Sequence, residues 1–293
     1  MMKDMLAERI RDYRPANSLE QENVLQELMQ SYVLASLSRA RFFAGACFHG
    51  GTCLRVLYGM NRFSEDLDFL LKVPDPRFLW EEYLEKIGKD FQDEGIQIEF
   101  QDRSEVTAAV KKAFIKTDSI GKILDLDLPY TRHKSKKVRI KLEIDTNPPE
   151  GSVFETRYLS FPVISAITTQ TLESSFATKS HALLCRTYAK GRDWYDFLWY
   201  VARRTVPDLT LLGNAIFQQG PWEGKKRTVS CDWYIETLRK AIRKMDWAEV
   251  RKDVGRFVID REQESLELWG TDLFLQQVDQ LQNYLVKRSS KKG

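Results

Sequence analysis

Residues 50–69 read GGTCLRVLYGMNRFSEDLDF, and this stretch decides the predicted fold. A small-residue turn opens an apolar helix, a polar loop follows, and an apolar strand then carries two aspartates, Asp66 and Asp68. Because alternate strand residues point to one face, the two carboxylates project together, about 6–7 Å apart. Such a pair repels itself unless solvent or a cation offsets the charge, so the strand predicts a site for a divalent cation.

The turn at the start of the stretch adds a place for phosphate. Gly50, Gly51 and Thr52 come just before or within the first turn of the helix. Backbone N–H groups at a helix start bind phosphate without a side-chain charge. Turn, helix, loop and acidic strand in this order therefore predict a site for a nucleoside triphosphate and its magnesium ions.

A third carboxylate is expected on a second strand. Residues 138–145, VRIKLEID, alternate strictly, so Arg139, Lys141, Glu143 and Asp145 share one face. Both acids are candidates to join the two aspartates, and an ordinary half-exposed strand with a charged outer face is the alternative. The lysine on that face could neutralise the acids or contact a phosphate.

A basic run overlaps this strand, with six Lys and Arg residues and no acid across 132–141. Clusters of this kind commonly contact the phosphates of nucleic acids. A solvated hairpin loop would explain the run equally well, and both interpretations stay open.

A second informative stretch is FATKSHALLCRTYAKGRDWYDFL, residues 176–198. It predicts a helix that carries Lys179 and ends near Gly191, followed by a helix that starts at Arg192 and Asp193. Glycine is common at the end of a helix, and an acidic residue is favoured in the first turn of the helix that follows. By spacing alone, the lysine is a surface residue and the acid stabilises a helix start.

Together the two stretches resemble the AbiEii/AbiGii-type toxin family of the polymerase-beta-like nucleotidyltransferase superfamily. The first matches its "GGT…LYG…RFSEDLDF" wording, and the second its "K…R…KGRDLYDL" segment, with Trp194 where Leu is usual. The family also has a "K-hydrophobic-E-hydrophobic" strand, which favours Glu143 over Asp145 as the third acid. The resemblance covers about half of the chain.

The resemblance implies roles for single residues. The implied metal ligands for Mg²⁺ or Mn²⁺ are Asp66, Asp68 and Glu143. The catalytic set adds Lys179 and Asp193 to these three acids. The implied nucleoside triphosphate (NTP) contacts are Gly50, Gly51, Thr52, Arg55, Ser64 and Lys179. Asp196 is expected to be a structural partner of Arg192 or Lys190.

The implied activity is metal-dependent transfer of a nucleoside monophosphate from an NTP to an RNA, typically the 3′ end of a tRNA, with release of pyrophosphate. Such a protein would be the toxin of a type IV toxin–antitoxin or abortive-infection pair, with a cognate antitoxin. The alternatives are nucleotidyl transfer to a protein hydroxyl or a small molecule, and a catalytically silent NTP-binding regulatory partner.

Length and composition limit the possible folds and the number of lobes. The chain has 293 residues, 43% hydrophobic and 12% aromatic, which is typical of a globular protein. We predict an α/β (α+β) fold in two lobes. Residues 1–150 would form a nucleotidyltransferase-type catalytic lobe with a mixed sheet and N-terminal helices. Residues 151–293 would form a mainly helical lobe that completes the cleft for nucleotide and acceptor.

Several classes are disfavoured. No apolar run of about 18 residues and no leader segment is evident, so a cytoplasmic protein without a membrane partner is expected. The four cysteines form no Cys-x-x-Cys pair, and only three histidines occur, which argues against zinc sites and hydrolase triads. No Gly-Lys-Ser/Thr phosphate loop is present, which excludes a P-loop ATPase. The net charge of +3 permits only a local basic patch, facing a tRNA-sized partner.

The remaining pattern predicts further elements. These are helices over 18–43, 78–94, 105–115 and 165–172, strands over 96–101 and 157–161, a hairpin over 123–145 and a loop over 218–230.

Overall fold

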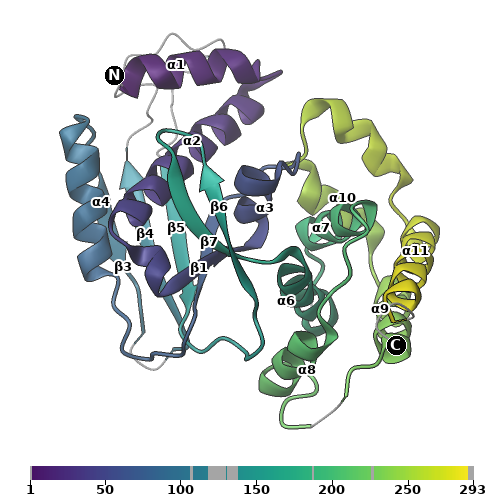
Figure 1. Cartoon of the computed structure of the whole chain (residues 1–293). Coiled ribbons are helices and arrows are strands. Elements are labelled where there is room, and N and C mark those ends of the chain that lie inside the picture. The colour runs from purple at the N-terminus through teal and green to yellow at the C-terminus, as the bar shows by residue number, and fades with distance from the viewer. Residues whose placement is uncertain are drawn as a thin grey trace. The chain divides into compact units, whose positions relative to one another are not determined.

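The computed structural model of the chain describes most residues, namely 2–105, 108–117, 130, 138–186, 188–225 and 228–289. These residues fall into two compact units (Figure 1). The first comprises Met1–Pro148 and Glu155–Thr169, and the second Pro149–Phe154 and Gln170–Gly293.

A seven-stranded mixed sheet forms the centre of the first unit, in the order β3-β4-β5-β2-β1-β7-β6. Its strands are β1 (Ala46–His49), β2 (Asp66–Leu71), β3 (Glu99–Asp102), β4 (Val110–Thr117), β5 (Val138–Asp145), β6 (Phe154–Leu159) and β7 (Ser165–Gln170). Strand β2 runs parallel to β5 and antiparallel to β1, while β4 is antiparallel to both β3 and β5. The predicted mixed sheet is confirmed.

The two central strands show why this sheet forms. Leu67 and Phe69 of β2, and Ile140, Leu142 and Ile144 of β5, are all buried. Each such side chain contributes roughly 1.5–3 kcal/mol on leaving water. Because successive residues alternate between faces, the charged residues of both strands lie on the opposite face from this apolar set.

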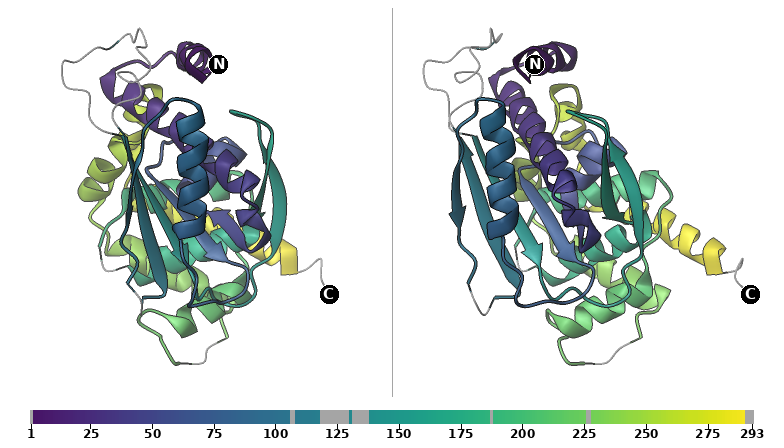
Figure 2. Two further views of the ribbon diagram at one scale, coloured as in Figure 1. Left: turned by 90° about the vertical axis from the view of Figure 1, so that its left-hand side faces the viewer. Right: turned by 60° about the vertical axis from the view of Figure 1, so that its left-hand side comes forward.

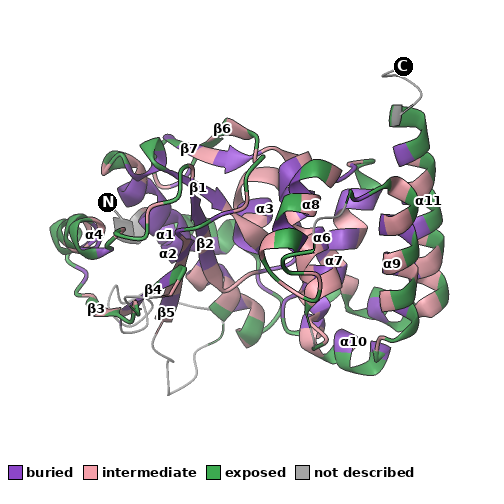
Figure 3. Cartoon of the chain, turned by 90° about the horizontal axis from the view of Figure 1, so that it is seen from below, coloured by how far each residue is buried: buried purple, intermediate pink, exposed green. Residues whose placement is uncertain are grey.

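Helices pack around the sheet of the first unit, as Figures 1 and 2 show. They are α1 (Met2–Tyr13), α2 (Ser18–Arg39), α3 (Gly50–Tyr58) and α4 (Glu81–Asp93), with a 3-10 turn η1 (Phe42–Ala44). Helix α2 starts at Asn17, whose side chain accepts a hydrogen bond from the backbone N of Glu20 at 2.9 Å, a stabilising N-cap. Most of α2 is buried, and it packs on α4 and β5 (Figure 3).

Two helix predictions are wrong. The segment predicted as a helix over 105–115 contains most of strand β4, and the segment predicted as a helix over 165–172 is largely strand β7. Both strands are held by pairing with distant partners: β4 with β3 and β5, and β7 with β1. Tertiary pairing therefore overrode the local signal.

The second unit is mainly helical, as predicted. Its elements are α6 (Leu172–Cys185), α7 (Gly191–Ala202), α8 (Leu209–Gln218), α9 (Cys231–Arg243), α10 (Trp247–Gly255), η2 (Asp260–Leu268) and α11 (Thr271–Ser289). Aromatic rings fill its core, with Trp194, Phe197 and Trp247 gathered around Phe274. The ring of Trp247 stacks on that of Phe274, with centroids 4.2 Å apart.

Two further predictions can be placed only in part. Most of the hairpin over 123–145 and of the basic run over 132–141 lies outside the described residues, which resume at Val138. Within the described part of the chain, each helix is too short or too polar to cross a bilayer.

Candidate active site

Strand β2 carries both aspartates, and helix α3 is tied to it. The hydroxyl of Thr52, in the first turn of α3, donates a hydrogen bond to the backbone carbonyl of Asp66. This bond fixes the start of the helix against the start of the acidic strand. Asp66 and Asp68 are each half-buried and occupy alternate positions of β2, as predicted.

The parallel pairing of β2 with β5 brings the predicted third acid to the aspartates. Asp68 is the register partner of Glu143, and Asp66 is the register partner of Lys141. Because paired residues in register point to the same side, these four side chains share one face of the sheet. Two strands that are far apart in the sequence thus build one charged surface.

A lysine neutralises part of this surface. The Nζ atom of Lys141 lies 2.8 Å from Oε2 of Glu143, and Nζ of Lys112 lies 3.6 Å from its Oε1. Burial acts to lower the pKa of Lys141, but the hydrogen bond to Glu143 and the charges of Glu143, Asp66 and Asp68 outweigh it, so that pKa is raised. Lys141 is therefore a firmly charged ammonium among three carboxylates.

Asp145 lies two residues further along the same face. Its register partner on β2 is Leu70, and its Oδ1 accepts a hydrogen bond from the backbone N of Asn147 at 2.9 Å. Burial raises the pKa of the Asp145 carboxyl. Its carboxylate thus supports the turn that ends β5, whereas Glu143 is the register partner of Asp68, and Glu143 as the third acid stays a prediction.

The donor set of this face suits a hard cation, because Mg²⁺ and Mn²⁺ prefer carboxylate oxygens. In the described part of the chain, no three His, Cys, Asp or Glu side chains stand close enough together to hold an ion as they lie. The carboxylate of Glu143 is instead engaged by Lys141. The two β2 aspartates fit the role of metal ligands. Glu143 would have to give up its ion pair with Lys141 for its carboxylate to bind a metal ion.

The glycine turn before α3 is packed tightly. Gly50 has φ of +80°, and a Cβ there would lie 2.5 Å from Oδ2 of Asp68. A Cβ on Gly51 would collide with the guanidinium of Arg62 and lie 3.0 Å from Oγ of Ser64. Gly50 therefore requires glycine, because its φ is positive and a Cβ would displace the acid, whereas a Cβ on Gly51 would push the end of the Arg62 side chain aside.

Arg62 was not singled out by the sequence. Its side chain is almost fully buried, and Nη1 donates a hydrogen bond to the carbonyl of Phe63 at 3.0 Å. It therefore places a cation against the turn that is predicted to bind phosphate. Its place between the glycine turn and the acidic strand, at the start of RFSEDLDF, is the only signal that points to it.

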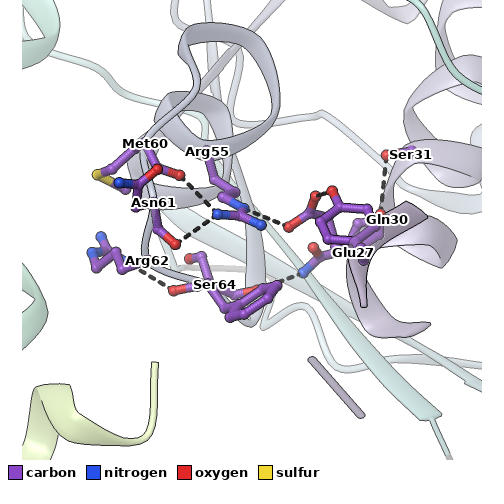
Figure 4. Close-up of polar contacts among 10 residues, drawn as sticks. Glu27, Gln30, Ser31, Arg55, Met60, Asn61, Arg62 and Ser64 are labelled. Carbon is purple, nitrogen blue, oxygen red and sulfur yellow. Dashed lines mark hydrogen bonds and ion pairs between the residues drawn. The ribbon is translucent and has the colours of Figure 1, made fainter. Parts of the chain in front are cut away.

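Arg55 contacts Glu27, Met60 and Asn61 (Figure 4). Its Nε lies 2.6 Å from Oε2 of Glu27 on α2, and its Nη1 donates to the carbonyls of Met60 and Asn61 at 3.1 and 2.6 Å. The guanidinium also lies 4.3 Å from the ring centroid of Phe63. These contacts hold the loop that leads to β2, and the predicted NTP contact of Arg55 stays a prediction.

Helix α2 supports the same loop through a glutamine that the sequence did not reveal. Nε2 of Gln30 donates to the carbonyls of Ser64 and Glu65 at 3.0 and 2.9 Å. Gln26 donates to the Glu65 carbonyl as well, at 3.0 Å. A polar residue at a buried helix position is the signal that could have identified Gln30.

In the second unit, Lys179 bridges two buried acids. Its Nζ lies 2.6 Å from Oδ1 of Asp193 and 2.8 Å from Oδ2 of Asp196. Asp196 pairs with Lys179, and its expected pairing with Arg192 or Lys190 stays a prediction. The helix that carries Lys179 ends at Cys185 rather than near Gly191, so the prediction of its end is wrong.

The charge of Asp193 is stabilised by its neighbours. Burial, with only 2% of the residue exposed, acts to raise the pKa of Asp193, but the charges of Lys179, Arg186 and Lys190 lower it to about 2. The Nε atom of Arg186 lies 3.1 Å from the second oxygen of this carboxylate. Lys179 and Asp193, predicted together, therefore form one ion-pair network in the second unit.

The sequence matches one family model, described as "Nucleotidyl transferase AbiEii toxin, Type IV TA system", over residues 32–277. No similar sequence is found among curated proteins.

Solved structures share the fold. MenT4, the nucleotidyltransferase toxin Rv2826c from Mycobacterium tuberculosis H37Rv, is 15% identical with a TM-score of 0.51, over 96% of this chain and 99% of that one. JHP933 from Helicobacter pylori is 17% identical with a TM-score of 0.54, over 93% of this chain and 96% of that one. At these identities the likeness concerns the fold alone.

Proposed function

Because the chain belongs to the AbiEii family of nucleotidyltransferase toxins, we propose that it transfers a nucleoside monophosphate from an NTP to the 3′ end of an RNA, typically a tRNA, releasing pyrophosphate. The protein would act in the cytoplasm as the toxin of a type IV pair, and a cognate antitoxin would be its protein partner.

The observation that carries the proposal is the acidic face of β2 and β5. Asp66 and Asp68 are in register with Lys141 and Glu143 on the adjacent parallel strand. Carboxylates arranged in this way would hold the divalent cations that neutralise the negative charge developing in phosphoryl transfer, where positioning and electrostatics supply most of the rate.

Asp66, Asp68 and Glu143 are the residues that would hold Mg²⁺ or Mn²⁺. When bound, the metal ions would favour ionisation of the acceptor hydroxyl and neutralise charge on the pyrophosphate. Lys141 already offsets part of the carboxylate charge, at 2.8 Å from Glu143. In this proposal its ammonium moves from the acid to a phosphate oxygen when substrate enters.

Two groups of residues would bind the triphosphate. In the first unit these are the N-terminal amides of α3 at Gly50 and Gly51, with Ser64 and Thr52 nearby. In the second unit Lys179 is the proposed contact, and Asp193 would hold its ammonium in place at 2.6 Å.

The test is incubation of the purified protein with each labelled NTP, magnesium and total tRNA, followed by a denaturing gel. Asp68→Asn and Glu143→Gln should abolish transfer, because each removes a charge from the acidic face while keeping the shape. Asp145→Asn is the matched control on the same strand face. An asparagine oxygen still accepts the bond from Asn147, so this variant should keep its activity.

Each outcome points to a different function. RNA nucleotidyl transfer is supported if the native protein and Asp145→Asn label tRNA while Asp68→Asn and Glu143→Gln do not. Label in a protein or in a small molecule would move the acceptor to the corresponding alternative. Tight NTP binding without turnover would indicate the silent regulatory partner, and full transfer by a folded Asp68→Asn variant would overturn the site.

A further inference from the structure

The segment that joins α6 to α7 presents an aromatic ring to solvent. Tyr188 is 63% exposed, although its ring is large and partly apolar. Nη1 of Arg186 donates a hydrogen bond to its hydroxyl at 2.9 Å, and the guanidinium lies 5.6 Å from the ring centroid. The exposed ring therefore has one polar contact, with Arg186, at its hydroxyl end.

The same arginine connects the ring to the ion-pair network of the second unit. Its Nε lies 3.1 Å from Asp193, which also accepts the ammonium of Lys179 at 2.6 Å. Tyr188 is thus linked through Arg186 and Asp193 to Lys179, the residue proposed to bind the triphosphate. A ligand group on the ring would lie beside that network.

Several cations of this network act on one another. The charges of Lys179, Arg186 and Lys190 act on Asp193, and Lys179 also pairs with Asp196. Burial lowers the pKa of Lys190, and the charges of Arg186, Lys179 and Arg192 lower it further, while that of Asp193 acts in the other direction. An anion beside Lys190 would relieve this repulsion.

We infer that Tyr188, Arg186 and Lys190 form a binding surface for the unpaired end of a nucleic-acid acceptor strand, with a base stacked on Tyr188 and the adjoining phosphate against Arg186 and Lys190. An exposed ring offers a π-face to any base, and neighbouring cations bind the backbone. A paired base is already stacked within its duplex, so the surface selects single-stranded ends. This inference rests on the proposed RNA acceptor and names where the acceptor binds.

The test measures binding without requiring transfer. A 5′-fluorescein single-stranded RNA of about 12 nucleotides, which covers a typical single-strand site, is titrated with the full-length protein and read by fluorescence anisotropy. Tyr188→Ala should weaken binding about 5- to 100-fold, the loss of one stacked base. Tyr188→Trp keeps an aromatic face and should bind as tightly as the native protein.

Phe217→Ala is the matched control, because Phe217 of α8 is an aromatic residue of the same unit that is 46% exposed. Its RNA affinity should equal that of the native protein. A blunt duplex of the same sequence should bind the native protein and Tyr188→Ala equally. The KM for NTP, measured in the transfer reaction, should be unchanged in Tyr188→Ala.

Two results would overturn the inference. One is native RNA affinity in Tyr188→Ala; the other is a raised KM for NTP with RNA affinity intact, which would assign the ring to the incoming nucleotide. Failure of the proposed function gives a different result. RNA binding would still be weakened in Tyr188→Ala, but the native protein would transfer no label to RNA. Unchanged labelling of RNA and unchanged binding by Tyr188→Ala would sink only the inference.

Discussion

Asp68 packs directly against Gly50. A Cβ placed on Gly50 would lie 2.5 Å from Oδ2 and 3.1 Å from Cβ of Asp68, and Gly50 has φ of +80°, which favours glycine. The turn that is predicted to bind phosphate and the acidic strand, separate in the sequence, are therefore in direct contact. A change in either one displaces the other.

Gly50→Ala should consequently reduce nucleotidyl transfer by about 100-fold or more, because a displacement of about 1 Å at a reacting group costs that much. Transfer rate at saturating NTP and magnesium measures the effect. Gly59→Ala is the control, since Gly59 also has a positive φ, +71°, yet an added Cβ there meets nothing within 4 Å. It should cost about 1–2 kcal/mol of stability and leave transfer intact. Equal losses of transfer in the two variants would refute the specific role of the Asp68 contact.

Arg55 and Glu27 should behave as a buried structural pair. Their side chains are 12% and 10% exposed, and Nε and Oε2 are 2.6 Å apart. Arg55→Met leaves the carboxylate without this cation and should lower the free energy of unfolding by about 3–5 kcal/mol.

The double variant Glu27→Gln/Arg55→Met removes both charges and should recover more than half of that loss in urea unfolding. Additive losses in the double-mutant cycle would show that the two side chains are not coupled.

Asp193 should make the protein sensitive to acid. Its pKa is about 2 in the folded protein, against an ordinary value of 3.8 that applies to the unfolded chain, so the unfolded chain takes up the proton first as the pH falls. The stabilisation is therefore complete above pH 3.8 and is lost between that value and 2. From pH 5, the loss should reach about 1 kcal/mol at pH 3 and about 2 kcal/mol at pH 2. In urea unfolding, the native protein should lose these amounts of stability beyond any loss in Asp193→Asn, so the two stabilities approach each other as the pH falls; parallel pH curves would contradict the assignment.

Gly191 lets α7 approach α10. A Cβ at this position would collide with the backbone carbonyl of Val250 and lie 3.0 Å from Cβ of Val254. Because a backbone atom cannot rotate away, Gly191→Ala should lower the free energy of unfolding, measured by thermal melting, by about 3 kcal/mol. Gly270→Ala, where an added Cβ meets nothing within 4 Å, should cost less than about 1 kcal/mol in the same measurement. A stable Gly191→Ala protein would mean that the two helices can separate without penalty.

The strands that the sequence predicted correctly are those whose charged and apolar residues alternate. Strand β5 keeps Ile140, Leu142 and Ile144 inside and its charges on the other face, so its pattern is visible. In β4 the alternation fails because Lys111 lies on a buried position, where its Nζ donates to the carbonyl of Glu105 at 2.7 Å. A buried lysine interrupts the alternation of apolar and polar residues from which a strand is predicted.

Strand β7 was mistaken for a helix for a related reason. Its buried residues include Ser165 and Thr169 beside Ile167, so polar side chains occupy the inner face. The site residues show a similar division. The motif located Asp66 and Asp68, but the partner of Arg55 depends on the packing of α2 against α3, which no local pattern encodes.

The parallel pairing of β2 with β5, and of β1 with β7, sets an order of events during synthesis. A ribosome that has just completed β2 has made both aspartates, but the strand that bears Glu143 and Lys141 is still unmade, and β7 comes later still. A nascent fragment therefore carries half of the acidic face without the strand that closes it. Because parallel pairing between distant segments must wait for the later strand, the acidic face is complete only after β5 has been made, and β1 gains its parallel partner only after Gln170, more than halfway along the 293 residues.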